Sequence, residues 1–321
     1  MKKILKILKI IVPIGIGIYL TWFFFHDLTK TEISQVKRSF LSANYLWVIL
    51  SLIVTFLSHL VRARRWLLLV APMGYKPKLS NAYHGVMAGY IINYTIPRAG
   101  EFARVGLMAR YEKLPIEKGI ATIVIERVID MIMLGLIILV TGYMQVDSDK
   151  FDQIMQTQEN TTNIFWPWIV VIVLVLGITA FILYLRSDKF RLLARQKIMS
   201  LWEGLRSFQK MEQKWRFTGY TFFIWICYVG GVWIFAQAFN ETANMPVESV
   251  FGVFVVGAAA IAILPGGLGA YPLWVNKVLV LYGIHFAGFG IFVWVVTTVL
   301  MIVLGLTSLF LIQRKKELAV H

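Results

Sequence analysis

The sequences IPRAGE at Ile96–Glu101 and LPGGLG at Leu264–Gly269 interrupt two long apolar stretches of this chain. Proline has no backbone N–H and disfavours a helical conformation in the residue before it, while glycine permits a sharp turn. Each segment therefore predicts the end of one short helix and the start of another. Inside a bilayer, backbone that leaves a helix is tolerated only where protein buries it or where it lines a watery cavity. The two breaks thus indicate where the chain handles a polar cargo.

Composition places the chain among membrane proteins. Hydrophobic residues make up 58% of its 321 residues, and its mean hydropathy is +0.70. Several uncharged runs approach the length of about 20 residues that a bilayer-crossing helix needs. The loops are too short to bury a core of their own, which excludes a soluble catalytic domain. The single cysteine, Cys227, lies in an apolar run, so neither a disulfide framework nor a cysteine metal site is expected.

The fold class that we predict is an all-α polytopic membrane protein with about six full transmembrane helices and two re-entrant hairpins. The six predicted spans are Ile7–Phe25, Ala43–Val61, Gly119–Tyr143, Ile164–Leu185, Phe217–Phe239 and Gly288–Ile312. Two further regions, Asn81–Pro97 and Val250–Leu281, extend for only half a span before Pro and Gly interrupt them. We interpret both regions as segments that enter the membrane and turn back.

The distribution of Lys and Arg distinguishes segments that turn back from segments that cross. If both regions turn back, most of the 32 basic residues fall on one side of the membrane, and the opposite loops Met144–Asn163 and Asn240–Ser249 are acidic. Cytoplasmic loops collect Lys and Arg, so we predict a multi-pass protein of the cell inner membrane with both termini in the cytoplasm. The same rule explains the net charge of +15, so nucleic acid is not an expected partner.

This topology repeats the unit of span, hairpin and span in the opposite orientation, which is an inverted repeat. We expect one integral membrane domain over residues 1–321, with a first repeat at 43–143 and its hairpin at 81–110. The second repeat is predicted at 217–312, with its hairpin at 250–281. Residues 186–216 are basic and carry apolar residues at helical spacing, which predicts a cytoplasmic amphipathic loop.

Three charged residues, Glu126, Arg127 and Asp130, lie in an otherwise apolar span. A charge at the bilayer centre costs about 2.5–3.5 kcal/mol on insertion scales, so all three must be paired or hydrated. Arg127 can pair with Asp130 along the helix, which leaves Glu126 for a cation of the first hairpin. Two interpretations stay open: a buried ion network that only locks the hairpin to the span, and charges lining a polar cavity that the cargo uses.

The first hairpin concentrates polar side chains at its tip. A helix that starts after Gly100 would present free N–H groups, which together with Arg98 and Arg104 would form an anion site. Phosphate is the obvious anion in a membrane, and either arginine is also a candidate partner for Glu126. The alternative is that both arginines only extend to the cytoplasmic headgroups. The candidate substrate-binding residues are Asn93, Arg98, Glu101, Arg104, Glu126, Arg127 and Asp130.

The backbone of the two breaks is a second candidate site. Its residues are Pro97, Gly100, Pro265, Gly266, Gly267 and Gly269. Glycines in the second hairpin permit close packing against the first hairpin or close approach of a ligand, and the pattern leaves both open. We interpret the cluster Arg62, Arg64, Arg65 and Trp66 as basic and aromatic residues at the cytoplasmic interface.

The chain lacks four common sequence signatures of enzymes. It contains no His-Glu-x-x-His, no Gly-x-Ser-x-Gly, no P-loop and no Gly-x-Gly-x-x-Gly fingerprint. We therefore predict no catalytic residue, no metal and no cofactor, and we expect the chain not to be an enzyme.

Four motifs in this order resemble the transmembrane flippase region of lysylphosphatidylglycerol synthases and its stand-alone relatives. They are Arg62–Trp66, Asn93 to Arg104 with Pro97-Arg98-x-Gly100-Glu101 inside it, Glu126-Arg127-x-x-Asp130, and Pro265–Gly269. The resemblance implies a lipid-translocating domain with two oppositely inserted hairpins. It also implies that Arg98, Glu101, Arg104, Glu126, Arg127 and Asp130 fall on the family's polar positions. The aminoacyl-transfer domain of the synthases has no counterpart here, so synthesis of lysylphosphatidylglycerol is not expected.

The function that these observations favour is translocation of a phosphate-bearing lipid or lipid-linked glycan between leaflets, without a nucleotide motor. One alternative is a membrane-embedded transferase in lipid or glycolipid assembly, with Glu126 or Asp130 as its base. Another is a non-transporting scaffold for an envelope enzyme. The expected partners are membrane lipids with anionic headgroups, and a homo-oligomer or an envelope-biosynthesis enzyme is a further candidate partner.

Overall fold

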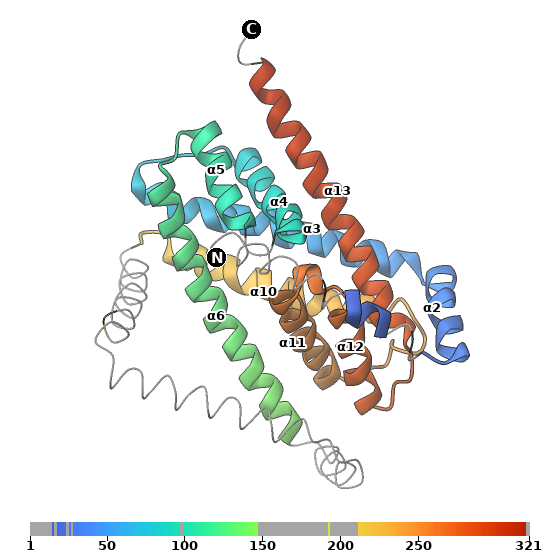
Figure 1. The fold of residues 1–321 in the computed structure, drawn as a ribbon. Coiled ribbons are helices and arrows are strands. Elements are labelled where there is room, and N and C mark those ends of the chain that lie inside the picture. The colour runs from blue at the N-terminus through green and yellow to red at the C-terminus, as the bar shows by residue number, and fades with distance from the viewer. Residues whose placement is uncertain are drawn as a thin grey trace.

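The computed structural model describes residues 28–96, 99–146 and 211–318, together with residues 15, 18–23, 26 and 192. Within these residues the regular structure consists of helices (Figure 1), so the all-α prediction is confirmed. Several predictions fall on residues outside this range. They are most of the span Ile7–Phe25, the span Ile164–Leu185, most of the loop 186–216, and residues Pro97 and Arg98.

The described helices form two sets with the same order, a long helix, two short helices and a second long helix. The first set is α3 (Tyr45–Val70), the short η1 (Ala71–Met73), α4 (Leu79–Thr95), α5 (Gly100–Glu112) and α6 (Ile116–Val146). The second set is α10 (Lys214–Ala236), α11 (Val247–Ile263), the short η2 (Pro265–Gly267), α12 (Ala270–Leu281) and α13 (Gly288–Leu318). The helix α2 (Lys30–Ser42) precedes both and packs against α13.

Three helical segments are long and apolar enough to cross a membrane among the residues that the structure describes. They are Tyr45–Met73, Lys214–Ala236 and Gly288–Ile312, which correspond to three of the predicted spans. The two shorter helices α11 and α12 are also apolar. A multi-pass membrane protein is therefore supported, while the count of six spans remains a prediction.

The first break joins two antiparallel helices. Gly89 on α4 lies against Gly100 on α5, and Gly85, one turn earlier on α4, lies against Arg104, one turn later on α5. A Cβ atom on Gly100 would overlap the carbonyl group of Gly89, so only glycine permits this approach. The backbone N–H of Gly100 donates to the side-chain oxygen of Asn93 (2.8 Å), which closes the start of α5.

The second break joins α11 and α12 in the same way. Gly257 on α11 lies against Tyr271 on α12, and the earlier Gly252 lies against the later Val278. The turn between them has left-handed backbone at Gly266 (φ 59°), where a side chain would be strained. Both predicted breaks thus form helical hairpins.

The tips of the two hairpins touch. A Cβ atom on Gly266 would overlap the aromatic ring of Tyr94, the penultimate residue of α4. The carbonyl oxygen of Gly266 accepts a hydrogen bond from Trp294 Nε1 of α13 (2.8 Å). Of the two roles left open for these glycines, the structure shows close packing against the first hairpin at Gly266.

The two sets run in opposite directions where they pack. Residues at the start of α3 contact the end of α10, since Asn44 N donates to Ala238 O (2.9 Å). Residues near the end of α3 contact the start of α10, since Arg65 Nη1 donates to Thr221 Oγ1 (3.2 Å). Two apolar clusters, one at each end of this helix pair, hold the sets together. This crossing brings the charged residues of α3 beside α6 and the first hairpin.

Candidate functional site

Five charged side chains from three helices meet in the interior of the described part of the chain. Arg62 and Arg65 come from α3, Arg104 from α5, and Glu126 and Asp130 from α6. Glu126 is only 2% exposed and Arg65 only 1%. Such burial costs several kcal/mol per unpaired ion, so these groups are stable there only as a network.

Glu126 lies at the centre of this network. Its Oε1 accepts from Arg62 Nε (2.9 Å) and from Arg65 Nη2 (3.3 Å), and its Oε2 accepts from Arg104 Nη2 (2.7 Å). The predicted contact between Glu126 and a cation of the first hairpin is therefore confirmed for Arg104. The guanidinium of Arg104 also lies 5.1 Å from the ring of Trp66, in cation–π geometry. Arg104 is buried, so the alternative that it extends to the headgroups is wrong for this residue.

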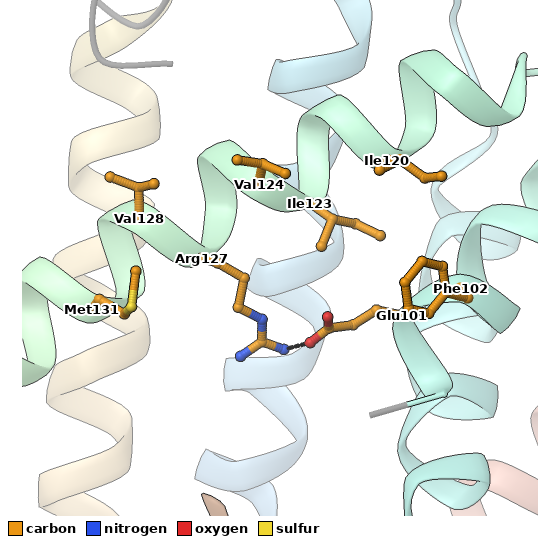
Figure 2. Close-up of a pocket in the computed structure, with 8 residues that line it drawn as sticks. All are labelled: Glu101, Phe102, Ile120, Ile123, Val124, Arg127, Val128 and Met131. Atoms are coloured by element: carbon orange, nitrogen blue, oxygen red, sulfur yellow. Dashed lines mark hydrogen bonds and ion pairs between the residues drawn. The ribbon is translucent and has the colours of Figure 1, made fainter. Parts of the chain in front are cut away.

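Asp130 completes the network one helical turn after Glu126. Its Oδ1 lies 2.8 Å from Arg65 Nη1, and its Oδ2 accepts from Arg62 Nη2 (3.3 Å). The predicted pair between Arg127 and Asp130 along the helix is wrong, because both oxygens of Asp130 face α3 instead. Arg127 turns the other way and pairs with Glu101 at the start of α5 (Figure 2).

Two tyrosine hydroxyl groups connect Arg62 of the network to other helices. Tyr90 of α4 accepts from Arg62 Nη1 at 2.8 Å, and Tyr228 of α10 lies 3.4 Å from the same nitrogen. Charge-assisted hydrogen bonds of this kind are stronger than neutral ones. The cluster therefore connects both helix sets through one guanidinium.

The sequence interpretation was wrong mainly for the arginines of α3 that join the cluster. We expected Arg62, Arg65 and Trp66 at a membrane interface, but Arg65 and Trp66 are fully buried, and Trp66 Nε1 donates to Thr122 Oγ1 (2.9 Å). Arg64, which lies between Arg62 and Arg65 in the sequence, is exposed. The spacing carried a usable signal, since positions 62 and 65 share one face of a helix and two buried carboxylates require cations.

Of the predicted binding residues, the structure brings five together: Glu101, Arg104, Glu126, Arg127 and Asp130. Asn93 also lies beside them, and its side-chain oxygen holds the amide of Gly100. Arg98 lies outside the described residues. The second-hairpin glycines line neither the cavity at this cluster nor the groove between α5 and α6 outside it.

The cluster carries excess positive charge and unused donors. Three arginines face two carboxylates, which leaves one positive charge uncompensated. Arg65 Nε and Arg104 Nε are buried, and neither has a hydrogen-bond partner among the described residues. A cavity of about 40 Å³ lies beside Arg104, and Arg62, Asn93 and Glu126 are among its other lining residues. An anion or a few water molecules would satisfy such a site, because one water needs about 10–15 Å³.

A metal centre is not supported within the described residues. No group of three or more His, Cys, Asp or Glu side chains is arranged to hold an ion there. His84 contacts Ser308 through Nδ1 (3.1 Å), which ties α4 to α13.

The comparison with known protein families bears on the whole of this arrangement. Residues 10–306 match the family described as the lysylphosphatidylglycerol synthase TM region, a range that includes both hairpins and the charge cluster. The chain belongs to this family. The chain is also similar to a UPF0104 membrane protein of Methanocaldococcus jannaschii, with 26% identity over 161 residues. That alignment covers 49% of this chain and 44% of the archaeal relative, so the chain matches less than half of that relative's length. No solved structure is significantly similar to this member of the family.

Proposed function

We propose that the chain moves a phosphate-bearing lipid, or a lipid-linked glycan, between the leaflets of the cell inner membrane without a nucleotide motor. The observation that carries this proposal is the buried charge cluster with its surplus of one cation. Intramembrane ionisable groups mark the paths of ions and polar substrates. A phosphodiester is the anion that a membrane supplies, and arginine binds it in a bidentate manner.

The hairpins support this proposal. Two helical hairpins from oppositely running helix sets touch at their tips, through Tyr94 and Gly266. In a membrane, such discontinuous helices form the sites of many secondary transporters near the bilayer midplane. We propose that the sets are an inverted repeat whose hairpins enter from opposite faces, so that the headgroup passes between them while the acyl chains stay in the bilayer.

A transferase is less well supported by the geometry. A general base needs a free oxygen within reach of the proton that it abstracts. Both oxygens of Glu126 accept from guanidinium groups, and both oxygens of Asp130 face arginines. These carboxylates are arranged to hold arginines in position, which fits binding of an anion better than proton abstraction.

The test is leaflet exchange of a labelled phospholipid in vesicles that contain the purified chain. Arg104→Gln makes the five-residue cluster neutral, and we expect exchange to slow by about tenfold or more, the factor that one charge-assisted hydrogen bond supplies. Arg104→Lys keeps the charge and should restore part of the rate. Arg110→Gln removes an exposed cation from the same helix and serves as the matched control. If wild type and a folded Arg104→Gln protein exchange the lipid at equal rates, the proposed role of the charge cluster in transport is excluded.

A further inference from the structure

An apolar groove lies between α5 and α6, outside the charge cluster. It encloses about 300 Å³, within the range of small-molecule sites, and is lined by Glu101, Phe102, Ile120, Ile123, Val124, Arg127, Val128 and Met131 (Figure 2). The six residues of α6 recur every three or four positions, so they form one face of the helix that is about 16 Å long. Phe102 is 63% exposed, so the groove opens to the surroundings of the protein.

One ion pair is the polar feature of this groove. Figure 2 shows the guanidinium of Arg127 directed at the carboxylate of Glu101 across the space between the two helices. The Arg127 side chain is 48% exposed and the Glu101 side chain 26%, whereas Arg65 and Glu126 of the inner cluster are 1% and 2% exposed. If this apolar surface faces lipid, as the proposed topology requires, an exposed ion pair on it is costly unless a polar ligand shares it.

The same ion pair also borders the inner cavity. Glu101, Ile123 and Arg127 line both the apolar groove and the small cavity beside Arg62 and Arg104. The pair therefore separates a surface that suits a hydrocarbon chain from an interior with excess positive charge. A ligand with an acyl chain and a phosphate matches both sides of this boundary.

We propose that the groove between α5 and α6 binds one acyl chain of a phosphate-bearing diacyl lipid, whose phosphate replaces Glu101 as the partner of Arg127. The Glu101–Arg127 pair is then the closed state of a lateral entrance to the cationic cavity. The inference rests on the proposed function for its cargo class and adds the place where the cargo enters. Charge complementarity selects this occupant, because a neutral lipid gains nothing from displacing the carboxylate.

The experiment is photo-crosslinking in dodecyl maltoside micelles, which contain no phosphate. Two probes with the same diazirine-bearing chains are compared, phosphatidylglycerol and diacylglycerol, and the labelled peptides are mapped by mass spectrometry. We expect phosphatidylglycerol to label residues 120–131 about tenfold more efficiently than diacylglycerol, as one charge-assisted hydrogen bond would give. Val124→Trp fills the groove and should abolish labelling there, whereas Leu139→Trp, on an exposed part of α6 outside the groove, should not.

Two variants that both break the ion pair distinguish a binding role from a structural one. Arg127→Gln removes the side chain that binds the phosphate. Phosphatidylglycerol should then label the groove no more efficiently than diacylglycerol. Glu101→Gln removes the competitor and should raise phosphatidylglycerol labelling above wild type. If both variants change labelling in the same direction, or if diacylglycerol labels the groove equally well, the inference is overturned.

The outcome is separable from that of the proposed function, because crosslinking in micelles involves no leaflets. Labelling as expected without leaflet exchange in vesicles would support the groove and remove the proposed function. Leaflet exchange that persists in Val124→Trp, without labelling of the groove in wild type, would overturn the groove and leave the function in place.

Discussion

At the scale of single residues, Glu126 has three guanidinium partners, and their number indicates how the residue tolerates substitution. A purely structural carboxylate needs one partner of opposite charge, whereas this residue holds one arginine from α5 and two from α3. Breaking a buried ion pair by removing one partner costs more than the pair itself contributes, because the remaining charge stays desolvated. The network is therefore intolerant of neutral substitution at its centre.

Glu126→Gln should lower the stability of the purified protein by about 3–5 kcal/mol, because three arginines would then share one carboxylate. Thermal unfolding in detergent, monitored as the loss of the monodisperse elution peak, measures this change in stability. Glu117→Gln removes an exposed carboxylate from the same helix and should leave the transition unchanged. A Glu126→Gln protein as stable as wild type would show that solvent reaches the cluster and compensates the arginines.

At the scale of helices, the contact between hairpin tips depends on one backbone conformation. Gly266 has φ of 59°, and its Cα faces the ring of Tyr94 with no room for a methyl group. Proline before it and glycine after it restrict and bend the turn. The second hairpin is thereby shaped to fit the first.

Gly266→Ala should destabilise the protein by about 1–3 kcal/mol, through left-handed strain and through overlap with Tyr94. The double variant Gly266→Ala/Tyr94→Ala relieves the overlap, so the two effects should be less than additive in a double-mutant cycle of thermal stabilities. Gly230→Ala is the matched control, since a Cβ there meets no atom within 4 Å. Strict additivity would contradict a direct contact between the tips.

At the scale of the whole molecule, helix ends gather into two opposite groups. Lys78 N donates to Glu112 Oε1 (3.1 Å), which holds the start of α4 beside the end of α5. At the other end, Gln35 Nε2 of α2 donates to His285 O (3.3 Å) in the connection between α12 and α13. The connection between α5 and α6, at residues 113–115, follows the end of α5 and therefore lies at the first end.

Cysteine accessibility tests this arrangement in a Cys227→Ala background. Cys227 is the single cysteine of the sequence, so its replacement leaves a chain without a thiol. Glu117→Cys, after α5, should react with a membrane-impermeant maleimide only in inside-out vesicles, and Glu241→Cys, after α10, only in intact cells. Both residues are exposed, so access depends on the side of the membrane. Labelling of both positions from one side would exclude oppositely inserted hairpins.

The sequence predicted much of the site because membrane insertion makes charges conspicuous. Glu126, Arg127 and Asp130 stood out in an apolar span, and Arg104 was correctly proposed as a partner of Glu126. Arg62 and Arg65 were missed because basic residues at the end of a span usually face the interface. Their burial depends on how α3 packs against α10 and α6, which no local pattern records.

The sequence by itself determined the helical class, the two breaks and the presence of charged groups within an apolar segment. These follow from short-range rules: backbone groups in lipid must be hydrogen-bonded locally, proline and glycine end helices, and charges oppose insertion. Only the tertiary structure decided which charges meet, that Arg127 turns outward to Glu101, and that Tyr94 meets Gly266. The physical reason is that these contacts join residues from separate helices, and the packing of whole helices selects their partners.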